Sequence, residues 1–178
     1  MTEQEIIIEK VKQEILNLGA LLTEVEAIGI IGSLASGNFV PEKSDIDILV
    51  VLDDLPKESW EEGGKALNWT YRIQNLLSKK CDRRVTVIIT CIEFLIDISD
   101  WYVFSFASDS ILIYDKGKVK KIFDKIMEKT KEWGLVQKQY ETYGHKLWGL
   151  NRPLNPGEIL DFHLEEKELD FLTEKDVK

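Results

Sequence analysis

Two segments decide the fold of this chain: IGSLASG at residues 31–37 and SDIDILV at residues 44–50. The first closes the apolar run AIGII at residues 27–31, which is typical of a buried strand that ends in a tight turn. The second starts with polar and apolar residues in alternation and then becomes wholly apolar, which predicts another strand over residues 45–52. Residues 33–44 carry Gly37, Asn38, Pro41 and Ser44, which indicates a loop.

Asp45 and Asp47 are two positions apart at the start of the second predicted strand. Because side chains alternate along a strand, both carboxylates are expected on the same face. Two carboxylates held together repel each other unless one is protonated or a cation lies between them. Mg²⁺ suits this arrangement, since it prefers oxygen ligands and keeps room for water and phosphate oxygens. Asp45 and Asp47 are therefore the candidate metal ligands and catalytic residues, although a capped turn leading into a strand would also explain them.

Gly32 and Ser33 end the first strand and are the candidate phosphate-binding residues. Glycine lets the backbone approach a phosphate closely. A serine at the start of a helical turn offers its hydroxyl and free N–H groups to phosphate oxygens. Ser44 joins them as a nucleotide-site candidate and can also orient the first carboxylate. A phosphate cradle beside a dicarboxylate metal site provides the parts for phosphoryl or nucleotidyl transfer.

The two segments together resemble the signature of the DNA polymerase β-like nucleotidyltransferase superfamily, in particular its small, minimal members from archaea and bacteria. The resemblance covers roughly residues 5–115. It implies transfer of a nucleoside monophosphate from an NTP, with ATP favoured, to an acceptor. Gly32 and Ser33 would then bind the β and γ phosphates, and Asp45 and Asp47 would hold two Mg²⁺ ions. The acceptor stays open between a small molecule, a protein and an RNA end, and some small relatives pair with a helical protein as antitoxins.

The chain departs from the family pattern in three places. Ser36 stands where a basic residue is usual, and the spacing between the segments is about one residue longer, which a loop tolerates. Thr86 occupies the position in the third strand where the family has another acidic residue. Asp82 lies four residues earlier, roughly 13 Å away along an extended strand, and could serve only in a different register. The alternative function is therefore a degenerate binding or interaction module, for example the antitoxin-like partner of a helical protein.

The whole sequence predicts an α/β (α+β) protein with a small mixed β-sheet flanked by helices. Residues 1–115 are expected to form the nucleotidyltransferase core, and residues 116–178 a helical C-terminal extension with an acidic tail, packed on the core or a partner. Expected helices cover residues 2–22, 59–77, 91–109, 118–133 and 136–148, and expected strands cover residues 27–31, 45–52, 84–90 and 111–114.

Composition excludes several other classes of function. A net charge of -9 argues against sequence-independent nucleic-acid binding, which needs a basic face. The lysines over residues 116–131 fit a solvated helix face better than an acceptor site. The two cysteines are too few and too isolated for a disulfide scaffold or a structural zinc site. Without a signal peptide or a long apolar run, the protein is expected to be soluble and cytoplasmic. The apolar stretch at residues 101–106 leaves a dimer face open as an alternative to a buried helix.

Overall fold

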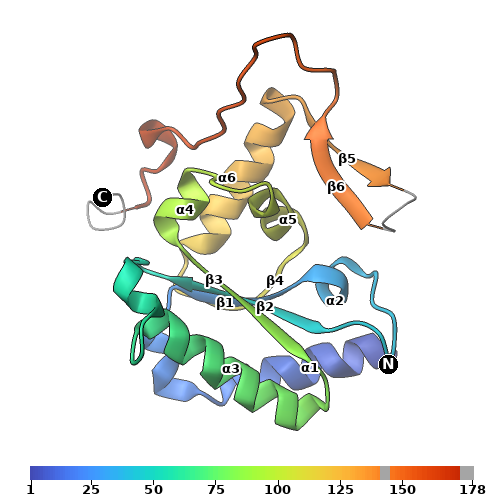
Figure 1. The fold of residues 1–178 in the computed structure, drawn as a ribbon, viewed down its shortest axis with the longest axis vertical. Coiled ribbons are helices and arrows are strands. Elements are labelled where there is room, and N and C mark those ends of the chain that lie inside the picture. Colours follow the sequence, from blue (N-terminus) through green and yellow to red (C-terminus); the bar gives the residue numbers. More distant parts are fainter. Residues whose placement is uncertain (141–144, 173–178) are drawn as a thin grey trace.

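A mixed four-stranded sheet in the order β3-β2-β1-β4 lies at the centre of the computed structural model, which describes residues 1–140 and 145–172 (Figure 1). The central strand β1 is antiparallel to both of its neighbours, β2 and β4, whereas β2 and β3 are parallel. The strands are β1 (Ala27–Ile31), β2 (Ile46–Leu52), β3 (Val85–Cys91) and β4 (Ile111–Asp115). Their alternating side chains point to two separate apolar cores, one on each face of the sheet.

Helices α1 (Glu3–Leu16) and α3 (Lys65–Cys81) cover one face of the sheet (Figure 1). The even-numbered residues of β1 and β2, such as Ile30 and Ile48, pack there against Trp69 and the other buried residues of these helices. Helix α3 begins six residues later than the sequence predicts, at Lys65 rather than residue 59. The reason is Gly63, whose φ of +82° breaks the helical path after the short 3₁₀ turn η2 (Lys57–Trp60).

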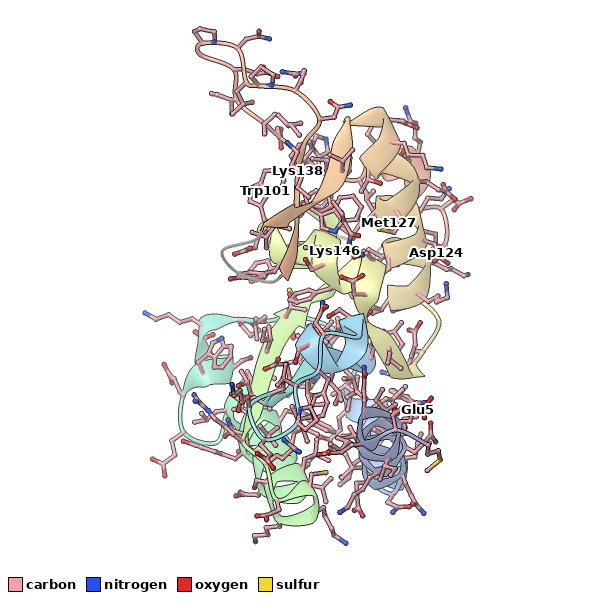
Figure 2. The ribbon with its side chains drawn as sticks, turned by 90° about the vertical axis from the view of Figure 1, so that its right-hand side faces the viewer. Glu5, Trp101, Asp124, Met127, Lys138 and Lys146 are labelled. Carbon is pink, nitrogen blue, oxygen red and sulfur yellow. The ribbon has the colours of Figure 1, made fainter. Side chains whose placement is uncertain are left out.

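Helices α4 (Ile92–Ile96), α5 (Tyr102–Asp109) and α6 (Val119–Glu132) cover the opposite face. The odd-numbered residues of β1 and β2, such as Ile31 and Leu49, belong to this second core. Figure 2 shows Glu5 of α1 and Asp124 of α6 on opposite sides of the sheet. The mixed sheet with helices on both faces confirms the predicted fold class.

The predicted helix over residues 136–148 is wrong. The described residues there form two antiparallel strands, β5 (Leu135–Tyr140) and β6 (His145–Leu150), and residues 141–144 lie outside the description. Gly134, at a φ of +69°, turns the chain out of the preceding helix. Trp148 and Leu150 pack on the second core while Leu147 is exposed, which is the period of a strand rather than of a helix.

The acidic tail returns to the second core after the β5-β6 hairpin. Leu164 and Leu169 are buried there, and the Leu164 N–H donates a hydrogen bond to the Ile96 carbonyl of α4. Phe162 packs edge-on against Phe104 at the centre of this core. The described part of the tail therefore shares its apolar core with the sheet. Across the described ranges, no helix combines the length and apolarity needed to cross a membrane.

Candidate functional site

The turn between β1 and α2 (Gly32–Ser36) packs directly against Asp47 of the next strand. Ile31 is the antiparallel pairing partner of Asp47, so the turn begins beside that carboxylate. Gly32 has a φ of +68°, and a Cβ built on it would lie 2.3 Å from the Asp47 Oδ2 atom. Glycine is therefore needed twice here, once for the backbone angle and once for the space that the carboxylate occupies.

Ser33 lies partly buried in the first turn of α2, next to this glycine. The residue before the helix is Ile31, whose side chain has no acceptor and makes no capping hydrogen bond. The N–H groups at the start of α2 thus lack a capping hydrogen bond from the side chain of Ile31, and Ser33 belongs to the same turn. This is a surface that phosphate oxygens can use as hydrogen-bond acceptors.

Asp47 lies in β2 and Asp45 directly precedes that strand, and both residues are partly buried. Burial raises the pKa of Asp47, and the negative charge of Asp45 raises it further. A hydrogen bond from Thr86 and the charge of Arg84 lower it again, but the net direction stays upward. Two ionised carboxylates are therefore unfavourable together, and a hard cation between them would remove the penalty. The donor set fits one Mg²⁺ ion.

Thr86 is the direct neighbour of Asp47 on the parallel strand β3. Asp82, the alternative acid, lies outside this strand: it is the exposed residue that ends α3, with a φ of +51°. Among residues 1–140 and 145–172, no three acidic, histidine or cysteine side chains come together as a metal-binding group. The structure therefore brings Asp45, Asp47 and Thr86 together and leaves Asp82 out.

Ser44 holds the loop that leads to the carboxylates. Its hydroxyl accepts a hydrogen bond from the Val40 N–H at 2.9 Å, and its own N–H donates to the Val40 carbonyl at 2.9 Å. These contacts close a turn directly before Asp45. In this structure the Ser44 side chain therefore helps to position the loop.

Arg83 and Arg84 make different contacts, and the sequence alone does not predict this difference. Arg83 has its Nη2 atom 2.6 Å from Glu3 Oε1, and its guanidinium lies 5.1 Å over the Phe39 ring. It therefore ties α1 to the loop before β2. Arg84 is exposed, and its Nε atom lies 3.6 Å from Asp45 Oδ2. Because the two residues are adjacent and both basic, the sequence does not show which one pairs with Glu3 and which one lies near Asp45; the folded backbone decides this.

The site thus combines a glycine turn, uncapped N–H groups and paired carboxylates at one end of a mixed sheet, which is an arrangement suited to a metal-bound phosphate compound. The family described as "Nucleotidyltransferase domain" matches residues 8–131. The chain belongs to this family, as the resemblance to DNA polymerase β-like nucleotidyltransferases predicted.

Solved structures give weaker similarities. A candidate nucleotidyltransferase from Sulfolobus solfataricus is 18% identical, with a TM-score of 0.41 over 65% of this chain and 86% of its own. A chain of a toxin–antitoxin complex with AMP-PNP is 16% identical, with a TM-score of 0.42 over 68% of this chain and 88% of its own. A chain from the complex of a tri-AMPylated Shewanella oneidensis HEPN toxin with its MNT antitoxin is 12% identical, with a TM-score of 0.39 over 72% and 91%. No curated protein sequence matches the chain.

Proposed function

We propose that this protein is a cytoplasmic, Mg²⁺-dependent nucleotidyltransferase that moves a nucleoside monophosphate from an NTP, with ATP as the favoured donor, to an acceptor. The observation that carries the proposal is the contact between the two halves of the site. The Gly32 turn lies against the Asp47 carboxylate so closely that a single added carbon would collide with it. A phosphate held at the turn would therefore also lie beside the carboxylate pair.

Each residue has a distinct part in this proposal. Gly32 lets the phosphate approach the backbone, and Ser33 donates hydrogen bonds to phosphate oxygens. Asp45 and Asp47 would hold Mg²⁺, which when bound supplies charge neutralisation and alignment of the phosphate oxygens. Partial burial of Asp47 strengthens its attraction to a cation, because water screens the interaction less. Ser44 and Arg83 keep the loop before Asp45 in place.

The acceptor is proposed only as a class: a small molecule, a protein or an RNA end. If the acceptor is a protein, the candidate is a helical partner protein, as for the antitoxins that the resemblance includes.

A second candidate function is favoured by Thr86. Because its neutral side chain faces Asp47 where a third acid would help to deprotonate the acceptor, the domain could bind Mg-nucleotide and act through a partner without transferring the nucleotide. The two functions share the nucleotide site and differ in whether the α-phosphate becomes attached to another molecule.

Isothermal titration with AMP-PNP, with and without Mg²⁺, tests the shared site. The wild-type protein should bind only with Mg²⁺, and the Asp45→Ala/Asp47→Ala variant should bind at least about 30-fold more weakly, since losing partners of a buried charge costs about 2–5 kcal/mol. Asp54→Ala is the matched control, because Asp54 is exposed just beyond the opposite end of β2. No binding by the wild-type protein at millimolar nucleotide would sink the proposal.

Transfer itself is tested with ATP labelled on its α-phosphate, incubated with the protein and an extract of the source cells. Label that becomes attached to an acceptor with the wild type, but not with the double variant, supports the enzyme. Nucleotide binding without any attached label supports the binding module.

A further inference from the structure

We propose that the site holds one divalent cation for each bound nucleotide, rather than two, and that Thr86 is the residue that sets this number. The inference rests on the proposed nucleotide site and concerns its metal content. It departs from the two ions that the resemblance implies.

The first argument is the set of side chains next to Asp47 on its own face of the sheet. Its neighbour on β1 is Ile31 and its neighbour on β3 is Thr86. The next pair along the same face, Leu49 and Ile88, is apolar and belongs to the second core. Asp45, directly before β2, is the acidic residue whose charge acts on Asp47, and the described residues offer no group of three acidic, histidine or cysteine side chains. Mg²⁺ bound to nucleotides commonly uses one or two carboxylates together with phosphate oxygens, so the pair is complete for a single ion.

The second argument is charge. Two divalent ions about 3.5–4 Å apart repel each other strongly, and sites that hold them offset this with several anionic oxygens. Here the third side chain is the neutral threonine that the register of β2 and β3 pairs with Asp47. The Arg84 guanidinium, with its Nε atom 3.6 Å from Asp45 Oδ2, adds a positive charge at the same end of the sheet. A second cation would enter a site that already lacks one negative charge and carries an extra positive one.

Manganese is the probe that counts the ions. The protein is equilibrated by dialysis against Mn²⁺ and saturating AMP-PNP, and the excess of Mn²⁺ on the protein side is divided by the excess of nucleotide there, so that Mn²⁺ bound to free nucleotide cancels. We expect a ratio of about one for the wild type and for Thr86→Val, and about two for Thr86→Asp, which restores a third carboxylate beside Asp47. Asn38→Asp is the matched control: it adds the same charge at an exposed residue just after α2, and its ratio should stay at one.

The thermal stability of the same variants, measured with and without Mn²⁺, is an independent test. Without metal, Thr86→Asp should be less stable than the wild type, because three carboxylates then share the site, and Mn²⁺ should stabilise it more than it stabilises Asn38→Asp. Thr86→Glu replaces the Asp variant if that variant fails to fold.

A wild-type ratio of two overturns the inference and leaves the proposed function intact. The inference is also overturned if Thr86→Asp folds, binds nucleotide and still takes up only one ion. Absence of nucleotide binding by the wild type overturns the proposed function together with the inference, so the two failures are distinguishable.

Discussion

Replacing Gly32 with alanine should destabilise the protein and disrupt its site at the same time. A left-handed backbone angle costs a residue with a Cβ about 1–2 kcal/mol, and Gly32 has a φ of +68°. The new Cβ would also lie 2.3 Å from Asp47 Oδ2, and relieving such crowding typically costs about 1–3 kcal/mol. We therefore expect the free energy of unfolding, measured by urea denaturation, to fall by about 2–5 kcal/mol in total. Mg²⁺-dependent binding of AMP-PNP should also weaken, because the Asp47 carboxylate must move.

Gly37→Ala separates the two contributions. Gly37 has a φ of +82° but no heavy atom within 4 Å of the position of an added Cβ, so only the backbone cost of about 1–2 kcal/mol applies. This variant should keep its nucleotide affinity. A double-mutant cycle of Gly32→Ala with Asp47→Ala should recover most of the free energy lost to crowding, since the second change removes Oδ2 and Cγ, the two atoms that would lie nearest to the new Cβ. Equal destabilisation by Gly32→Ala and Gly37→Ala, with additive effects in the cycle, would refute the proposed contact between turn and carboxylate.

Two further predictions concern the pH dependence and the tail. The pKa of Asp47 is raised in the folded state, so folding binds a proton and the metal-free protein should lose stability as pH rises from the ordinary carboxyl value of 3.8 toward the raised one. Melting temperatures measured in EDTA across this range should show that loss in the wild type and much less of it in Asp47→Asn; an unchanged profile in the variant would contradict the cause given. Leu164→Ala should lower the free energy of unfolding by about 2–5 kcal/mol in urea, because Leu164 is only 3% exposed against the second core. Ile159→Ala is its control at an 89% exposed position, and equal effects would argue against a packed tail.

The parts of the fold that the sequence predicts well are those that depend on local periodicity. The alternation of Asp45 and Asp47 with apolar residues predicts both carboxylates on one face, and in the structure the charge of Asp45 acts on Asp47 at the start of β2. The apolar runs of β1 and β2 are recognisable for the same reason: both strands are buried on each face of the sheet. Such a pattern can be predicted from the sequence because the alternation of neighbouring residues alone determines which face of the strand is apolar.

The β5-β6 hairpin shows where this reasoning fails. In sequence, its charged and apolar residues follow neither a clear helical nor a clear strand period. Its conformation depends on contacts with elements that are distant in the chain. Trp148 and Gln137 both have side-chain nitrogens 3.3 Å from the Ser108 hydroxyl oxygen of α5. The role of Arg83 was missed for the same reason, because it comes from a contact with Glu3, 80 positions earlier in the chain. None of these contacts is visible in local sequence spacing.

Thr86 stands in the sequence where the family has a third acidic residue, and in the structure it is the direct neighbour of Asp47. A neutral residue in a predicted strand could have been offset by an acid elsewhere, and Asp82 was the candidate. The parallel register instead pairs Thr86 with Asp47, and Asp82 ends the preceding helix outside the strand. The same strand pairing that assembles the carboxylate pair therefore also fixes a neutral side chain beside it. A carboxylate at that position would both attract a second cation and accept the proton of the acceptor. The number of bound ions and the ability to transfer the nucleotide should therefore change together when Thr86 is replaced by an acidic residue.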